Sequence, residues 1–198
     1  NCEGAAANLD KELSHWSFDK VKREAKQQWK RILSRVKVEG ASKEETRVFY
    51  TALYHAYLAP YLFSDVHGNY KGPDGEIHSV GKANQYTVFS LWDTFRATHP
   101  LFTITQKDRV NDMIKSFIRH YEAYGLLPRW ELMGNETYCM IGNHAIPVIT
   151  EAYLKGIRDF DVEKAYEAMK ETSLSRGDGL GLFRTYNYIP CDLEKESV

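Results

Sequence analysis

The chain has 198 residues, which is enough for one domain with a sizeable core or for two small domains. Its 26 Lys and Arg residues nearly balance its 27 Asp and Glu residues, and no basic stripe is present, which argues against nucleic acid as a partner. No apolar run approaches the ~20 residues that span a bilayer, so we expect no membrane span. Aromatic residues make up 13% of the chain, which suits a carbohydrate site as well as a large helical core.

The three cysteines lie far apart, at Cys2, Cys139 and Cys191. Without a CxxC pair a structural zinc site is not expected, and an odd count fits neither a disulfide framework nor a redox motif. We interpret Cys139 as a small buried residue.

The first third of the chain predicts two helices after a short lead-in. Residues 1–16 carry no long periodic pattern and are interpreted as a linker or lead-in. Apolar residues at three- and four-residue steps predict a helix over about 19–36. A second helix is predicted to begin at Ser42, where Ser42 and Glu45 form a capping box, and to end at Pro60.

Residues 64–88 lack helical periodicity and are rich in turn residues. The Pro-Asp-Gly sequence between Tyr70 and Ile77 predicts a small hairpin. A loop of this length between helices is uncommon without a function, so we expect it to line a cleft.

Four further helices are predicted after residue 90. They cover about 91–98, ended by Pro100, and about 107–124, then about 139–155, kinked by Pro147, and about 162–172. Residues 126–137 are expected to be irregular, and three glycines are expected to loosen the chain after the last helix: Gly177, Gly179 and Gly181.

This succession of helices with long, decorated loops defines the fold class. We predict a mainly α chain of helical hairpins, stacked as part of a ring or toroid, with a small β-hairpin in a long loop. A compact four-helix bundle fits less well because its loops would be shorter.

One cluster of residues suited to sugar binding surrounds Trp92. Asp93 and Arg96 are three residues apart, so on a helix they share a face and are expected to form an ion pair. An aromatic ring beside a carboxylate offers a platform and an acceptor for paired hydroxyls. The alternative is that Asp93 caps a helix whose Trp92 belongs to the core.

A second cluster, Trp130-Glu131-Leu132-Met133-Gly134-Asn135-Glu136-Thr137, is expected in a loop that leads into a helix. Asn135, Glu136 and Thr137 are hydrogen-bonding groups at this helix entry, where backbone N–H groups are also free. The alternative is an ordinary cap with Glu136 favoured by the helix dipole. His144 is a weaker candidate, since a lone histidine on an apolar helix is usually structural. Phosphate-loop, HExxH and GxSxG motifs are absent.

Several segments together resemble glycoside hydrolase family 92, the α-mannosidases. The segments that carry the resemblance, in chain order from about Gly4 to the end, include Tyr50-Thr51-Ala52-Leu53-Tyr54-His55, Phe63-Ser64-Asp65-Val66, Ser90-Leu91-Trp92-Asp93-Thr94-Phe95-Arg96, His99-Pro100-Leu101, Gly134-Asn135-Glu136-Thr137, Met140-Ile141-Gly142 with His144, and Ala152-Tyr153-Leu154-Lys155-Gly156-Ile157.

The resemblance implies an N-terminal β-sandwich followed by an (α/α)₆ toroid, of which residues 17–198 would be the first part. It also implies an exo-acting, inverting, calcium-dependent enzyme that removes α-mannose from glycan ends such as those of N-glycans. Inversion needs an acid and a base with ~6.5–9.5 Å between their carboxyl groups. In the family these groups and the calcium ligands come later, so we expect no catalytic or metal-binding residue before Val198.

For the residues present, the resemblance implies a −1 mannose subsite with Trp92 as a wall and Asp93 as hydroxyl acceptor. Arg96 would hold Asp93 in place, and Glu136 would contact substrate or support the site. Expected partners are mannose-containing glycans, the rest of the catalytic domain and the β-sandwich, in an extracellular or periplasmic location. Alternatives are a non-catalytic carbohydrate-binding or helical scaffold domain, or another (α/α)₆ glycosidase.

Overall fold

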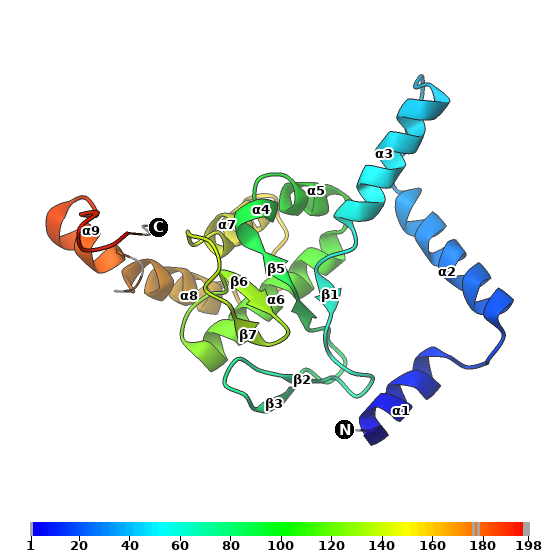
Figure 1. Ribbon diagram of the computed structural model, residues 1–198, viewed down its shortest axis with the longest axis horizontal. Helices are drawn as coiled ribbons and strands as arrows, with labels where there is room; N and C mark the ends of the chain where they lie inside the picture. The colour runs from blue at the N-terminus through cyan, green and yellow to red at the C-terminus, as the bar shows by residue number, and fades with distance from the viewer. Residues whose placement is uncertain (1, 176, 178, 196–198) are drawn as a thin grey trace. The chain divides into compact units, whose positions relative to one another are not determined.

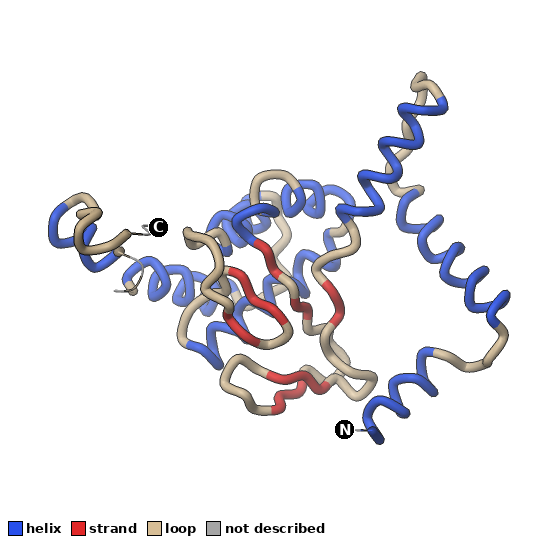
Figure 2. Tube along the Cα trace, in the orientation of Figure 1, coloured by secondary structure: helices blue, strands red, loops and turns tan. Residues whose placement is uncertain are grey.

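A computed structural model describes residues 2–175, 177 and 179–195 (Figure 1). The chain divides into two compact units, one extending to Ala59 together with Asp65–His67, the other comprising Pro60–Ser64 and the chain from Gly68 onward. Helices dominate, with short strands between them (Figure 2), which confirms the prediction of a mainly α chain. No helix in the described ranges is both long and apolar enough to cross a membrane.

The first unit contains three helices, α1 (Cys2–Glu12), α2 (Phe18–Leu33) and α3 (Lys43–Ala56). Helices α2 and α3 form a hairpin in which the rings of Trp29 and Tyr54 meet edge-on, with centroids 4.5 Å apart. This pair is the kind of helical hairpin predicted from the sequence.

Helix α1 lies within residues 1–16, where the sequence pattern indicated only a linker or lead-in. None of its described residues is buried, so it has no apolar stripe from which periodicity could be recognised. Consecutive alanines nevertheless favour helix. The side-chain oxygen of Asn8 accepts a hydrogen bond from the N–H of Val66 at 3.0 Å.

The predicted capping box at the start of α3 is confirmed. The hydroxyl of Ser42 accepts the N–H of Glu45 at 3.2 Å, and the Glu45 carboxylate accepts the N–H of Ser42 at 2.8 Å. Two of the backbone donors that a helix N-terminus leaves without a partner are thereby satisfied.

The second unit begins with two small antiparallel sheets. Strand β1 (Tyr61–Leu62) pairs with β4 (Tyr86–Thr87). Strands β2 (Asn69–Lys71) and β3 (Ile77–Ser79) form the hairpin predicted between Tyr70 and Ile77, which is therefore confirmed.

A third sheet joins strands distant in sequence, in the order β5 (Phe89–Ser90), β6 (Trp130–Leu132) and β7 (Asn135–Glu136). The expectation that residues 126–137 are irregular is therefore wrong. Strands of two or three residues are too short to show alternation, which explains why the sequence pattern did not reveal them.

Two short helices replace the one predicted over about 91–98. They are α4 (Leu91–Thr94) and α5 (Thr98–Thr105). Pro100 was expected to end a helix, but it lies in the first turn of α5. Proline is tolerated there because the backbone N–H of the first turn has no partner within the helix.

Helix α6 (Lys107–Tyr124) is the centre of the second unit and matches its prediction. It contacts α5, α7, α8 and β4, and its side chains Val110, Ile114 and Phe117 are almost completely buried. Gly125 follows in a left-handed conformation, with φ 90°, and ends the helix.

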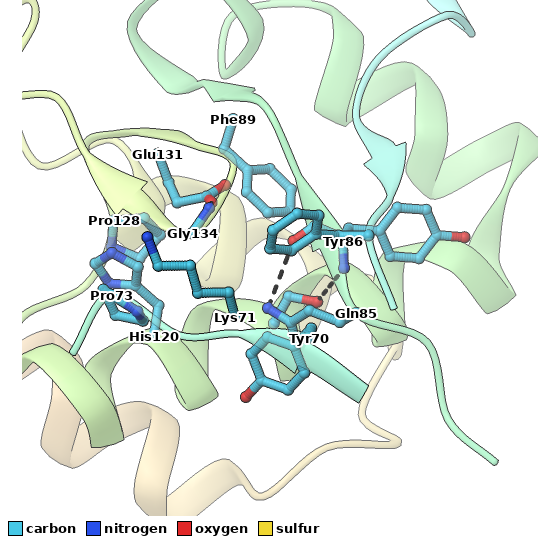
Figure 3. A pocket seen from close by; sticks show the side chains of 12 residues that line it. Tyr70, Lys71, Pro73, Gln85, Tyr86, Phe89, His120, Pro128, Glu131 and Gly134 are labelled. Atoms are coloured by element: carbon cyan, nitrogen blue, oxygen red, sulfur yellow. Dashed lines mark hydrogen bonds between the residues drawn. The ribbon is translucent and has the colours of Figure 1, made fainter. Parts of the chain in front are cut away.

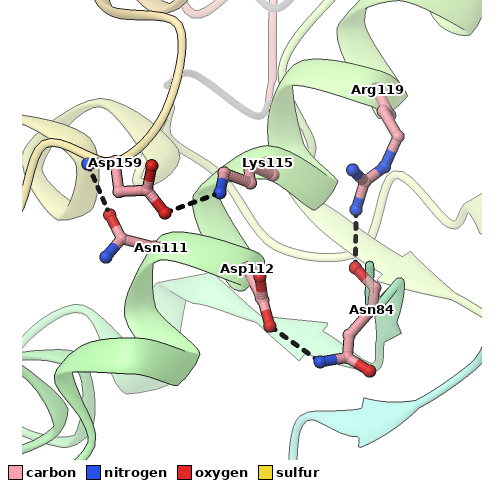
Figure 4. Close-up of polar contacts among 6 residues, drawn as sticks. All are labelled: Asn84, Asn111, Asp112, Lys115, Arg119 and Asp159. Carbon is pink, nitrogen blue, oxygen red and sulfur yellow. Dashed lines mark hydrogen bonds and ion pairs between the residues drawn. The ribbon is translucent and has the colours of Figure 1, made fainter. Parts of the chain in front are cut away.

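Polar side chains of α6 attach neighbouring segments of the chain to this helix (Figure 4). The amide of Asn84 donates to Asp112 at 2.8 Å, and Arg119 donates to the carbonyl oxygen of Asn84 at 2.7 Å. Lys115 forms an ion pair with Asp159 at 3.0 Å. The Asn84 contacts fix the segment that leads into β4 against the core helix, and the Lys115–Asp159 pair fixes the segment that precedes α8.

The remaining helices are α7 (Ala145–Leu154), α8 (Val162–Leu174) and α9 (Leu180–Tyr186). Helix α7 begins later than predicted, so Pro147 lies in its first turn and does not kink its interior. Cys139 precedes the helix and is exposed, so its predicted burial is wrong. Of the three glycines expected to loosen the chain, Gly181 instead lies inside α9. Residues 176 and 178 lie outside the described residues.

Candidate functional site

Asp93 lies in the first turn of α4, with an exposed side chain beside the half-buried ring of Trp92. Its carboxylate accepts a hydrogen bond from the hydroxyl of Ser90, the residue at the N-cap position of the helix. Asp93 is therefore not the cap, which removes that alternative. An exposed carboxylate beside an aromatic ring can accept hydrogen bonds from vicinal hydroxyls while the ring contacts their carbon skeleton.

Arg96 stacks on aromatic rings rather than pairing with Asp93, so the predicted ion pair is corrected. Its guanidinium carbon lies 4.5 Å from the ring centroid of Trp92 and 5.0 Å from that of Phe95. One guanidinium nitrogen donates to the carbonyl oxygen of Trp92 at 3.0 Å. Cation–π contact and this hydrogen bond draw the side chain back over its own helical turn.

The imidazole of His144 also stacks on the ring of Phe95. The two rings are parallel within 2°, with centroids 4.2 Å apart. Burial and the nearby charge of Arg96 lower the pKa of His144 below its usual value, which favours the neutral imidazole. These contacts favour a structural role for His144, in which the imidazole supports the ring of Phe95.

Glu136 lies on strand β7 and not at a helix entry, so the predicted setting of this residue is wrong. Its carboxylate accepts four backbone N–H groups at 2.8–3.1 Å, those of Arg129, Trp130, Thr137 and Tyr138. A carboxylate with so many donors fixes the ends of the β6–β7 hairpin. Of the two parts predicted for Glu136, these contacts favour support of the site.

The three-stranded sheet joins the two predicted clusters, although about 40 residues separate them in sequence. Ser90 at the end of β5 lies opposite Trp130 on β6, and Glu131 on β6 lies opposite Glu136 on β7. The segment that carries Asp93 is therefore attached through Ser90 to the hairpin that Glu136 fixes.

Glu131 belongs to the second sequence cluster but was given no role there, and its side chain is only 5% exposed. Its carboxylate accepts hydrogen bonds from the hydroxyl of Thr87 and from the N–H groups of Val88 and Gly134. Burial raises the pKa of Glu131 above its usual value, although these hydrogen bonds act in the opposite direction. A useful signal was the Met133-Gly134 pair, since glycine in a two-residue loop between short extended segments indicates a hairpin.

A small cavity lies beside this carboxylate (Figure 3), and none of the four predicted site residues lines it. Its polar lining includes Gln85, Ser116, His120 and Glu131. The imidazole Nδ1 of His120 lies 3.0 Å from the carbonyl oxygen of Leu126, and burial lowers the pKa of this histidine. The cavity is too small for a sugar ring and belongs to the framework of the site.

The described part of the chain contains no group of three or more His, Cys, Asp or Glu residues placed to hold a metal ion. The calcium implied by the family resemblance therefore has no fitting donor set among these residues.

Comparison with a protein-family model supports the resemblance. The model described as the Glycosyl hydrolase family 92 catalytic domain matches residues 4–198. A protein of Arthroderma benhamiae described as an uncharacterized secreted glycosidase is 26% identical over 203 residues, which cover 96% of this chain and 22% of that protein.

Solved structures give the same result. The chain is similar to the family GH92 α-mannosidase BT3965 from Bacteroides thetaiotaomicron, with 39% identity over 97% of the chain and a TM-score of 0.92. It is also similar to the family GH92 inverting mannosidase BT2199 of the same organism, with 33% identity over 96% of the chain and a TM-score of 0.88. The chain spans 26% and 27% of these two proteins, respectively.

Proposed function

Because the chain belongs to glycosyl hydrolase family 92, we propose that the intact protein is an exo-acting α-mannosidase that removes terminal mannose from glycans. The observation that carries this proposal is the 39% identity to an α-mannosidase over 97% of the chain. The family model matches residues 4–198, a range that includes both sequence clusters singled out for sugar binding.

In this proposal Asp93 and Trp92 form part of the −1 subsite. The Asp93 carboxylate accepts hydrogen bonds from two adjacent mannose hydroxyls, and Trp92 forms an apolar wall beside the ring. Arg96, stacked on Trp92, keeps the indole in place. Glu136 acts on the site indirectly, by holding the β6–β7 hairpin.

Bond cleavage itself requires groups outside this chain. We propose an inverting reaction, in which an acid and a base beyond Val198 flank the bond with space for a water molecule. We further propose that calcium is needed and that its oxygen ligands also come from outside the chain. An extracellular or periplasmic location is supported by the description of the Arthroderma benhamiae relative as secreted.

The proposal is tested with the full-length protein and a panel of aryl glycosides. We expect release of the aryl group from the α-mannoside and little from the α-glucoside, α-galactoside or β-mannoside. Proton NMR at early times should detect β-mannose as the first product, as inversion requires. A preference for another glycoside would contradict the assignment to mannose, and α-mannose as first product would contradict inversion.

The need for calcium is tested separately by exhaustive chelation followed by addition of calcium or magnesium. We expect activity to fall on chelation and to return with calcium. Full activity of the chelated protein would exclude the metal requirement. Residues 1–198 expressed alone are expected to release no mannose, and calcium-dependent release by this segment would show that it contains the catalytic pair.

A further inference from the structure

The buried carboxylate of Glu131 and the buried hydroxyl of Thr87 form a junction between β4 and the β6–β7 hairpin. The hydroxyl lies 2.9 Å from both carboxylate oxygens, and it accepts the N–H of Met133 at 2.8 Å. The carboxylate also accepts the N–H of Val88 at 3.1 Å and that of Gly134 at 2.6 Å. We call this cluster the Thr87–Glu131 junction.

Two residues held by the junction have a backbone conformation that side chains disfavour. Val88 has φ 67° and Met133 has φ 51°. The left-handed region is costly for residues with a Cβ and especially for a β-branched valine. The junction accepts the N–H of each, Val88 through Glu131 and Met133 through Thr87. It therefore stabilises two strained positions together.

The strain at Val88 lies where the chain changes sheets. Val88 separates β4, which pairs with β1, from β5, which pairs with β6. Its left-handed conformation sets the direction of Phe89 and Ser90, the two residues that connect Val88 to α4. Figure 3 shows the Phe89 ring beside Glu131 and Gly134, so the start of β5 lies directly on the junction.

The direction of β5 matters because Ser90 donates its hydroxyl to Asp93. A relaxation of Val88 toward an ordinary backbone conformation would rotate β5 and move both Ser90 and the first turn of α4. Thr87 and Glu131 are only 1% and 5% exposed, so neither offers a surface on which a sugar could bind.

We infer that Glu131, acting with Thr87 through Val88, is a positioning residue that sets the orientation of Asp93 and Trp92 for sugar binding. This inference rests on the proposed function. The buried Glu131 carboxylate would affect substrate affinity without contacting the sugar, because it holds the backbone that leads to Asp93.

The first test compares Thr87→Val with Thr87→Ser in the full-length protein. Valine keeps the shape of threonine but loses the hydroxyl, whereas serine retains it. We expect Thr87→Val to raise KM for an aryl α-mannoside about tenfold, and Thr87→Ser to stay within about twofold of wild type. Rates are measured at 25 °C, below the thermal transition of each variant.

A second test uses glycine to remove the steric cost at residue 88. In Glu131→Gln, the amide group can accept only through its oxygen, so one of the N–H groups of Val88 and Gly134 loses its acceptor. We expect KM to rise about tenfold. Adding Val88→Gly should recover part of this loss, because glycine adopts positive φ freely. A role in stability alone predicts no recovery of KM.

The outcomes separate this inference from the proposed function. A wild-type KM in Thr87→Val, with a lowered thermal transition, would overturn the positioning role and leave the mannosidase proposal intact. Wild-type cleavage of a different glycoside would overturn the mannose assignment alone, and the same variants would then be judged on that glycoside. A wild-type protein that cleaves no glycoside would overturn both.

Discussion

The hydroxyl of Ser90 donates a hydrogen bond to the carboxylate of Asp93, three residues later in the chain. Ser90 is also paired with Trp130 in the three-stranded sheet. The orientation of the exposed carboxylate is thus set by a residue whose backbone is fixed by the strand ladder.

Ser90→Ala should leave the carboxylate of Asp93 in place but free to rotate. Loss of a hydrogen bond to a charged group costs about 1.5–3 kcal/mol when the group is shielded from water. Ser90 is only half-buried, so we expect kcat/KM of the full-length protein for an aryl α-mannoside to fall about tenfold. Ser90→Thr, which keeps the hydroxyl, should restore most of the activity. Equal values in all three proteins would show that the contact is irrelevant to turnover.

Asp93→Ala removes the proposed hydroxyl acceptor altogether. If the Asp93 carboxylate accepts two hydrogen bonds from mannose, kcat/KM of Asp93→Ala should be about 100-fold or more below that of wild type. The value for Asp93→Asn should lie between those of wild type and Asp93→Ala. The exposed Asp108, in the first turn of α6, provides a matched control. Its alanine variant should remain within about twofold of wild type. Unchanged activity in Asp93→Ala would remove Asp93 from the site.

Glu136→Gln should weaken the β6–β7 hairpin more than it changes the sugar contacts. The amide nitrogen of glutamine cannot accept a hydrogen bond, so backbone donors among Arg129, Trp130, Thr137 and Tyr138 lose their acceptor. We expect faster hydrogen exchange at these amides, equivalent to about 1–3 kcal/mol of local stability. Glu76→Gln, at an exposed site following the β2–β3 turn, serves as control. Protection at wild-type level would contradict the supporting role.

Gly134→Ala should be far more disruptive than Gly75→Ala, although both glycines have positive φ. A Cβ at Gly134 would lie 2.3 Å from the carbonyl oxygen of Lys71, whereas one at Gly75 would meet open space. The free energy of unfolding of Gly75→Ala should fall only by the conformational cost of a left-handed alanine, about 1–2 kcal/mol. Thermal unfolding of the two full-length variants measures the difference. A similar transition temperature would mean that the Lys71 backbone moves aside freely.

The buried His99 gives the protein a component of acid sensitivity. It is 3% exposed, and burial lowers its pKa from 6.5 to about 4. A depressed folded-state pKa contributes stability that is complete above about pH 6.5 and is lost as pH falls toward about 4. The full change corresponds to about 3 kcal/mol. The thermal transition should therefore fall less steeply with pH in His99→Leu than in wild type, whereas the exposed His67→Leu should follow wild type.

The helical part of the fold could be predicted because its packing is periodic. Helix α6 buries one face against several neighbours, and the spacing of Val110, Met113 and Phe117 expresses this directly. Helix α3 was recognisable from Ser42 and Glu45, because capping is a local contact. Helix α1 lacks a buried face, so no equivalent signal exists for it.

The arrangement of the candidate site was less accessible to sequence reasoning. Trp92 and Asp93 were expected on a short helix and Glu136 at a helix entry, and their roles in sugar binding remain predictions. The sheet that joins their segments depends on pairing between Ser90 and Trp130, which no local pattern encodes. Arg96 was misassigned because helical spacing places both Asp93 and Trp92 within its reach, and the guanidinium stacks on Trp92 and Phe95 instead of pairing with the carboxylate.

The distance in sequence between β5 and β6 also has a consequence for the order of events during synthesis. Strand β5 cannot pair until β6 has been made, and helices α4, α5 and α6 lie between them. At ~5–20 residues per second, the ribosome adds the intervening segment over a few seconds. Helix α6 has local contacts and can form within that time, but the sheet has to wait. The framework that orients Asp93 is therefore completed late, after the helix on which it rests.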